Sequence, residues 1–216
     1  MASGKPTGAG PSGKETTVAA IILAAGSSRR FGADNKLLAL VDGEPLLRRV
    51  AGQFLRSRAG RIVVVTGHQR EAIATALADL DIQLVHNDRH LQGMGYTVAA
   101  GVRALGETVR CAVITPGDLP GLTAALIDRL IMIADVAGFD RIVYPTLPTG
   151  EQRNPVLWPR RFFVELAALT GDAGARGLIQ HHKGDAMPIS VDDASMFLDI
   201  DRPEDLRNWV KRGAKP

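Results

Sequence analysis

Continuous apolar runs alternate along the chain with segments in which apolar residues recur every three or four positions. The continuous runs are rich in β-branched residues, which predicts strands buried on both faces. They are the run that begins at Val18 and residues 61–67, 82–85 and 111–115. The helical spacing predicts helices at residues 45–56, 69–80, from about 96, and 122–134. This alternation predicts an α/β fold with a mostly parallel sheet and helices on both faces.

The second half of the chain is less regular. Residues 142–146 predict a strand and residues 160–169 a helix. Pro155 cannot donate to a sheet ladder, so residues 156–158 are expected at a sheet edge or in a short excursion. The apolar residues before Asp199 predict one more strand, and a last helix follows it.

Length and charge set limits on the class of protein. A chain of 216 residues is long enough for one large domain with a real core. Residues 1–16 are rich in Gly, Pro, Ser and Thr, so we expect them to form a disordered leader. We expect a single domain at residues 17–212 and a flexible tail at residues 213–216. The net charge is +3, and residues 211–216 carry three basic side chains and no acid. Nucleic-acid binding therefore receives little support.

Cysteine content and hydropathy limit which sites and which cellular compartment we expect. Cys111 is the only cysteine, which excludes an internal disulfide and a cysteine-based metal site. Its place in a predicted buried strand favours a core thiol over a nucleophile. The sequence contains no apolar stretch of about 18 residues that would predict a membrane span. We expect a cytoplasmic protein without membrane contact.

The loop after the first predicted strand has the composition of a phosphate-binding segment. Ala24, Ala25 and Gly26 carry almost no side chain, so a ligand could take hydrogen bonds from successive N–H groups. Arg29, Arg30 and Lys36 follow within one short loop and supply positive charge. A polyphosphate would use all of these groups. An ordinary solvated loop is the alternative interpretation.

Acidic residues follow two later segments. Asp118 lies just past the predicted strand 111–115, where ligands bind in open α/β sheets and where Mg²⁺ could be held against phosphates. It could equally be a turn residue before the next helix. Asp199 and Asp201 are two residues apart, which in a strand points them to one face. Because Glu204 follows Asp201 as in a capping box, we expect Asp201 to cap the last helix and Asp199 to be freer to bind metal.

Two glycine-containing segments remain open to more than one interpretation. Gly93 and Gly95 precede a predicted helix whose first N–H groups could face a ligand. The third glycine of a dinucleotide fingerprint is missing, so a Rossmann pyrophosphate site is weakly supported. The segment from Asp172 to Arg176 fits either loop chemistry or contact with a substrate anion.

Five motifs occur in order. They are LAAGSSRRFG at 23–32 with Lys36, GDLP at 117–120, NPVL at 154–157, GDAGAR at 171–176 and DIDRPED at 199–205. Together they resemble the nucleotidyltransferases of molybdenum cofactor maturation over residues 18–210, and most of all the molybdenum cofactor cytidylyltransferases. The resemblance implies a Rossmann-like, glycosyltransferase-A-type domain that uses a nucleoside triphosphate and Mg²⁺.

The resemblance also implies roles for individual residues. Lys36, Asp118 and Arg30 would be catalytic, and Asp118, Asp199 and Asp201 would hold Mg²⁺. The acceptor would be bound by Asn154, Asp172 and Arg176. The nucleotide would be bound by Leu23, Ala24, Ala25, Gly26, Ser28, Arg30, Lys36, Thr66, Gly95, Thr97, Pro116 and Gly117.

The implied reaction is transfer of CMP from CTP to the terminal phosphate of a molybdopterin-type cofactor, with release of pyrophosphate. The implied partners are CTP or GTP, a phosphorylated pterin and a molybdoenzyme. Ala25 favours CTP, because guanine-using relatives carry glycine there. The alternatives are a guanylyl- or other nucleotidyltransferase with another phosphorylated acceptor, a dinucleotide-using oxidoreductase, or a non-catalytic protein that hands over the cofactor.

Three positions depart from the family pattern. Phe31 stands where methionine is usual, and three residues instead of two separate Gly32 from Lys36. Arg202 replaces the usual threonine of the last motif, which leaves the role of Asp201 open.

Overall fold

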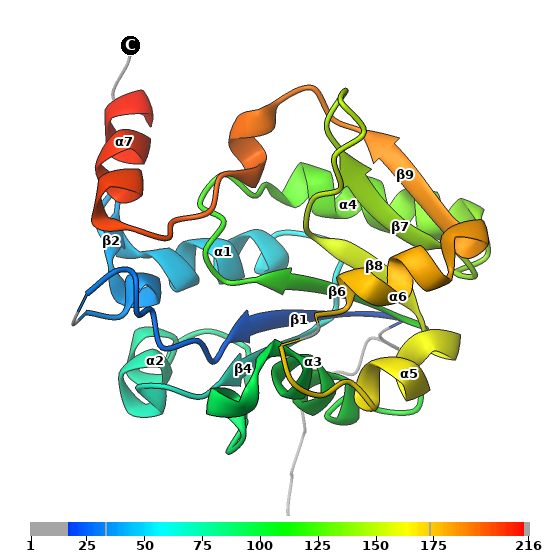
Figure 1. The fold of residues 1–216 in the computed structure, drawn as a ribbon, viewed down its shortest axis with the longest axis horizontal. Helices are drawn as coiled ribbons and strands as arrows, with labels where there is room; N and C mark the ends of the chain where they lie inside the picture. Colours follow the sequence, from blue (N-terminus) through cyan, green and yellow to red (C-terminus); the bar gives the residue numbers. More distant parts are fainter. Residues whose placement is uncertain (1–16, 33, 173, 214–216) are drawn as a thin grey trace, which may run out of the picture.

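A seven-stranded sheet forms the centre of the computed structural model, which describes residues 17–32, 34–172 and 174–213. The strand order is β5-β4-β1-β6-β8-β7-β9 (Figure 1). The strands are β1 (Val18–Ala24), β4 (Arg61–Thr66), β5 (Gln83–His86), β6 (Cys111–Pro116), β7 (Ile142–Thr146), β8 (Val156–Pro159) and β9 (Ala186–Ser190). A two-stranded hairpin, β2 (Leu40–Val41) and β3 (Glu44–Pro45), turns at Asp42-Gly43 beside it.

The first half of the sheet is parallel. β1 lies between β4 and β6, and β5 extends the sheet beyond β4, all in the same direction. β1, β4 and β6 are buried almost throughout, as expected for strands covered on both faces. The predicted mostly parallel α/β fold is confirmed.

The second half of the sheet differs from the prediction at β8. β8 is not an edge strand but lies between β6 and β7, antiparallel to both. Pro155 is tolerated because it precedes the first paired residue, Val156, which lies opposite Ile114. β9, which the periodicity does not predict, forms the edge next to β7, a place where Pro188 is permitted.

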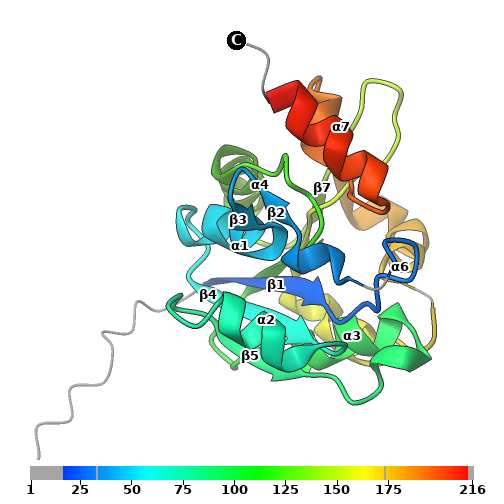
Figure 2. The same cartoon turned by 90° about the vertical axis from the view of Figure 1, so that its left-hand side faces the viewer.

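Helices cover both faces of the sheet. Figure 2 shows α1 and α4 above β1 and α3 below it. The helices are α1 (Leu46–Leu55), α2 (Arg70–Ala76), α3 (Met94–Arg103), α4 (Ala124–Val136), α5 (Phe163–Ala167), α6 (Arg176–His181) and α7 (Pro203–Gly213). The predicted helices match α1 to α5 and α7 to within a few residues, except that residues 160–162 form a 3₁₀ turn before α5. The sequence does not predict α6.

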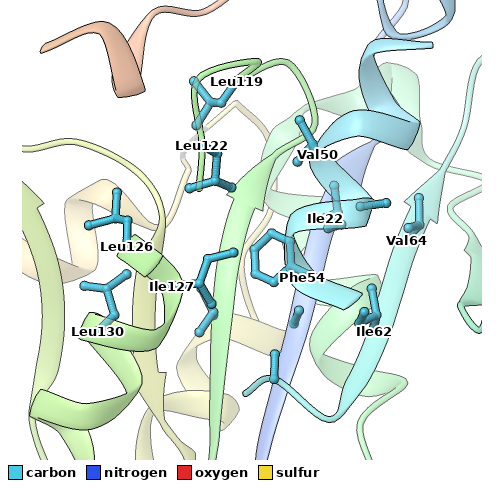
Figure 3. Close-up of a cluster of buried hydrophobic side chains, with 14 of the residues drawn as sticks. Ile22, Val50, Phe54, Ile62, Val64, Leu119, Leu122, Leu126, Ile127 and Leu130 are labelled. Carbon is cyan, nitrogen blue, oxygen red and sulfur yellow. The ribbon is translucent and has the colours of Figure 1, made fainter. Parts of the chain in front are cut away.

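Two hydrophobic cores result, one on each face. On the face of α1 and α4, Phe54 lies fully buried between the two helices and the sheet, near Ile22 and Ile127 (Figure 3). On the other face, α3 and α5 pack on β1 and β6 around Trp158. The two cores hold the carboxyl ends of β1 and β6 in fixed positions.

The segment before Asp199 is not the predicted strand. Residues Ala194–Phe197 form a 3₁₀ turn, because the Asp193 carboxylate accepts a hydrogen bond from the Ser195 N–H at 2.9 Å. The Ile200 N–H then donates to the carbonyl of Asp118 at 3.1 Å instead of pairing with a strand. The chain end is thereby tied to the loop after β6.

The remaining expectations concern the chain ends and membranes. The expected leader, and all of the expected tail except Gly213, lie outside the described residues. Among the helices that the structure describes, none is long and apolar enough to cross a membrane.

Close packing of α3 on the sheet gives a stability prediction. A Cβ at Gly101 would lie 2.5 Å from Cγ2 of Ile21 and 2.9 Å from Cγ2 of Val65, so Gly101→Ala should lower the free energy of unfolding by about 1–3 kcal/mol. Gly177→Ala on α6 is the control, because a Cβ there meets no atom within 4 Å. It should be neutral or stabilise by up to about 1 kcal/mol. Urea unfolding of both variants checks this, and equal effects would contradict the packing.

Candidate functional site

The candidate site lies where β1 and β6 end. The two strands run in parallel with Leu23 opposite Pro116, so the loops that follow them leave the sheet side by side. The Gly117 N–H donates to the Leu23 carbonyl at 3.0 Å and extends this pairing by one residue. The predicted phosphate-binding loop and Asp118 therefore meet at one edge, as expected for an open α/β sheet.

Local hydrogen bonds shape the loop between β1 and Lys36. Ser28 has a left-handed backbone, with a φ of 51°, and its carbonyl accepts from the Phe31 N–H at 2.8 Å. The Asn35 carboxamide oxygen accepts from the Leu37 N–H at 3.0 Å and begins the 3₁₀ helix Lys36–Leu38. The Ser28 hydroxyl donates to Asn35 Oδ1 and accepts from the backbone N–H of Lys36, each at 3.3 Å. These contacts place Lys36 opposite Asp118.

The Lys36 ammonium lies between two carboxylates. Its Nζ is 2.6 Å from Oδ2 of Asp118 and 2.8 Å from Oδ1 of Asp201. Arg30 Nη1 contacts the other oxygen of Asp201 at 2.9 Å. The Lys36 and Asp118 side chains are only 16% and 14% exposed, whereas Arg30 is 68% exposed. Lys36 and Asp118 therefore form a mostly buried centre of the cluster, and Arg30 is its solvent-exposed cation.

Burial and charge act on the pKa values of the cluster in opposite directions. Burial raises the pKa of Asp118, and the neighbouring ammonium offsets this only in part. Burial alone would lower the pKa of Lys36, but its two carboxylate partners outweigh burial and raise it. Burial likewise opposes the ionisation of Asp201, yet Lys36 and Arg30 hold its pKa below the usual value. Lys36 is therefore charged at neutral pH.

Asp118 has one carboxylate oxygen that could coordinate a metal ion. Its Oδ1 is buried and makes no hydrogen bond to any residue in the described part of the chain. An unpaired buried carboxylate oxygen is costly unless a cation or another donor reaches it. No group of three or more His, Cys, Asp or Glu residues that could hold a metal occurs among the described residues. Asp118 and Asp201 thus fit Mg²⁺, which commonly takes one or two carboxylates and completes its shell with phosphates and water.

The two aspartates near the chain end differ from their predicted roles. Asp205, and not Asp201, caps the start of α7, because its carboxylate accepts from the N–H groups of Asp201 and Arg202 at 3.1 and 2.8 Å. The Asp201 carboxylate is left for Lys36 and Arg30. Asp199 lines a separate small hollow beside Trp209, although its charge still raises the pKa of Asp118. Period-two spacing fails here because the segment is not a strand.

At the start of α3, the Gly95 N–H is not free, and residues 170–172 pack closely on Gly93 and Gly95. The Gly95 N–H donates to the carbonyl of Gly171 at 2.8 Å. A Cβ at Gly93 would lie 2.1 Å from the carbonyl carbon of Gly171, and one at Gly95 2.7 Å from the carbonyl oxygen of Thr170. These glycines are required by the loop that packs on them. The Gly95 N–H is therefore already bonded within the chain, and the nucleotide contact expected for Gly95 stays a prediction.

A cleft of about 460 Å³ adjoins the cluster. Of the predicted nucleotide-binding residues, Ala24 and Thr66 do not line it: Ala24 is buried at the end of β1, and Thr66 bonds the Val85 carbonyl at 3.3 Å. Arg30 reaches the cluster through Asp201. Predicted site residues that line the cleft are Leu23, Ala25, Gly26, Ser28, Lys36, Thr97, Pro116, Gly117, Asp118 and Asp172.

The cleft also contains residues that the sequence does not single out. His90, Leu91 and Met94 lie in its wall. Gly67 allows this, because a Cβ there would lie 2.5 Å from Cβ of His90. Leu91 is 69% exposed and Met94 54%, so both apolar side chains are accessible at the cleft. Gly67 and His90 are far apart in the sequence, and no sequence pattern connects them. The sequence therefore does not predict this wall.

The predicted acceptor-binding residues fall into two cavities. Asn154 and Arg176 line a second cavity of about 250 Å³, whereas Asp172 lines the cleft beside Lys36. Leu23, Met94 and Pro116 line both, so the two cavities share a wall.

The chain is similar in sequence and fold to several known proteins. The chain is 28% identical to the molybdenum cofactor cytidylyltransferase of Escherichia coli strain K12, over 86% of this chain and 92% of that protein. It is 29% identical to the bifunctional protein GlmU of Cutibacterium acnes over 90% of its length, and spans 44% of that longer protein. The structure of Rv0371c from Mycobacterium tuberculosis H37Rv has a TM-score of 0.79 at 23% identity, covering 91% of this chain and 99% of that chain.

A family model described as the MobA-like NTP transferase domain matches residues 20–186. The match covers β1 to the start of β9 and includes the loop after β1, Lys36 and Asp118. The chain belongs to the MobA-like NTP transferase domain family.

Proposed function

We propose that the protein transfers CMP from CTP to the terminal phosphate of a molybdopterin-type acceptor and releases pyrophosphate. The observation that carries the proposal is the position of Lys36 between Asp118 and Asp201, next to the small-residue loop after β1. One cation and two carboxylates at the mouth of a cleft of about 460 Å³ form a set suited to a metal-bound triphosphate.

The carboxylates are the metal side of the site. Asp118 and Asp201 would hold Mg²⁺, and the unpaired Oδ1 of Asp118 supports this assignment. When bound, Mg²⁺ neutralises charge on the phosphates and orients them for displacement. Because Asp199 lines a separate hollow, we assign it an effect through its charge and not direct ligation of the metal.

The cations are the phosphate side of the site. The Lys36 ammonium pairs with both carboxylates in the protein alone, and it would be free to turn toward the phosphates if Mg²⁺ took its place beside the carboxylates. Arg30 is exposed and held by Asp201 alone, and its side chain can turn to the triphosphate. Each cation thus exchanges a carboxylate for a phosphate when substrate enters.

The reaction requires positioning more than covalent help from the protein. A terminal phosphate of the acceptor attacks the α-phosphorus of CTP, the bond to the β-phosphate oxygen breaks, and pyrophosphate leaves. The shared wall of Leu23, Met94 and Pro116 would hold the acceptor in the second cavity beside the nucleotide. Holding both reactants in line, with the developing charge neutralised, supplies most of the acceleration.

A change at Lys36 tests whether the ammonium stabilises the buried carboxylate. Lys36→Met leaves Asp118 without its ion pair, so its pKa should rise further. A buried carboxylate with a raised pKa opposes folding only when ionised, and this penalty grows as the pH rises through the folded-state pKa. We expect a loss of about 3 kcal/mol at pH 7 that shrinks toward pH 4.

Urea unfolding between pH 4 and 8 measures this difference. Lys211→Met is the control, because Lys211 is an exposed residue of α7 outside the cluster. A loss at Lys36 that did not change with pH would contradict the assigned ion pair.

Calorimetric titration with CTP, GTP and ATP, each with and without Mg²⁺, tests the nucleotide assignment. Wild-type protein should bind CTP most tightly, and only with Mg²⁺. Ala25 lines the cleft, and Ala25→Gly removes a methyl group where the base approaches the backbone, so the preference for CTP over GTP should fall about tenfold. Ala24→Gly is the matched control, since Ala24 is buried outside the cleft. Tight binding of GTP alone would overturn the proposal of a cytidylyltransferase.

A further inference from the structure

The second cavity collects polar atoms that have no partner. Six buried side-chain nitrogen or oxygen atoms lack a hydrogen bond within the described ranges. Three of them, Gln152 Oε1, Arg153 Nε and Trp158 Nε1, belong to residues that line this cavity. An unpaired buried polar group is unfavourable because it has lost its hydrogen bonds to water. Their concentration around one cavity indicates that a ligand or ordered water completes them.

The backbone holds these residues in place. Gln152 forms a bridge with Thr146 at the end of β7, and the Arg153 N–H donates to the Pro145 carbonyl at 2.8 Å. Trp158 is a fully buried residue of β8, paired with Ala112. Arg153 also contacts Glu151 through Nη2 at 2.7 Å, which leaves Nε as its unpaired donor. Trp158 therefore belongs to a strand, and Gln152 and Arg153 belong to a loop that backbone contacts tie to β7.

The chemistry of the cavity defines the class of ligand. Its walls are largely apolar, with Val98, Ile114, Val156 and Ile179 among them, which suits a flat ring system. One amide oxygen and two N–H donors match the edge of a heterocycle that both donates and accepts hydrogen bonds. Arg153 and Arg176 line the cavity and no acidic residue does, so a phosphorylated ligand is favoured.

We propose that Gln152 and Trp158 are specificity-determining residues that recognise the hydrogen-bonding edge of a phosphorylated, planar nitrogen heterocycle in this cavity. This inference rests on the proposed function, because it identifies the cavity as the acceptor site. A site built to hydrogen-bond a ligand rejects analogues that lack the matching groups, since its own buried groups then stay unpaired. Gln152 would accept from the ring, and the Trp158 indole would donate to it.

Direct binding of 6-hydroxymethylpterin phosphate, followed by pterin fluorescence, tests the inference without turnover. Gln152→Leu removes the amide, and Trp158→Phe removes the indole N–H while keeping an aromatic ring. Each should weaken pterin binding about tenfold, the effect of one lost hydrogen bond. CTP binding measured by calorimetry should not change. Trp209→Phe is the matched control, because Trp209 packs on the opposite core and not at the cavity.

The outcomes separate the inference from the proposed function. Urea unfolding establishes that each variant is folded, and Gln152→Leu should keep wild-type stability because it deletes an unpaired oxygen. Unchanged pterin affinity in both variants, or wild-type protein that binds no pterin, overturns the inference even if CTP binds. Absence of CTP binding to wild-type protein overturns the proposed function, whatever the pterin result.

Discussion

The contact on which the site depends is the Lys36 ammonium between the carboxylates of Asp118 and Asp201. Three distant segments meet there: the loop after β1, the loop after β6 and the segment before α7. Burying a carboxylate is unfavourable unless a cation reaches it, so the free protein supplies its own cation. The same arrangement holds the pKa of Asp201 below its usual value, offsets in part the effect of burial on the pKa of Asp118, and keeps Lys36 charged.

Strand pairing and one backbone hydrogen bond bring the three segments of this contact together. Parallel pairing of β1 with β6 brings their two loops together, and the Ile200 N–H bound to the Asp118 carbonyl brings Asp201 to the same place. The two cores fix the strand ends, so the cluster does not depend on flexible loops alone. Only Arg30, exposed and joined through Asp201, is free to reorient without disturbing the core.

Local patterns predict the parallel half of the fold because each buried strand there is a continuous apolar run. They fail at β8, where Pro155 indicates an edge but lies just before the paired residues, and at Asp199, where a 3₁₀ turn replaces a strand. Lys36, Asp118 and Arg30 could be identified from residue chemistry and family resemblance. The hydrogen bond of Gly95 to Gly171, and the walls formed by His90 and Trp158, arise from contacts between distant segments. Sequence spacing does not report such contacts.

The central claim is that Asp118 serves metal-dependent transfer of a nucleotidyl group, which ³¹P NMR of a reaction containing CTP, Mg²⁺ and molybdopterin tests most directly. Wild-type protein should convert the phosphomonoester resonance of the acceptor into a diphosphate pair and produce one pyrophosphate per acceptor consumed. Asp118→Asn, which keeps the shape of the side chain but removes its charge, should produce neither. Diphosphate and pyrophosphate formed by Asp118→Asn at the wild-type rate, or orthophosphate as the only product of wild-type protein, would contradict the account.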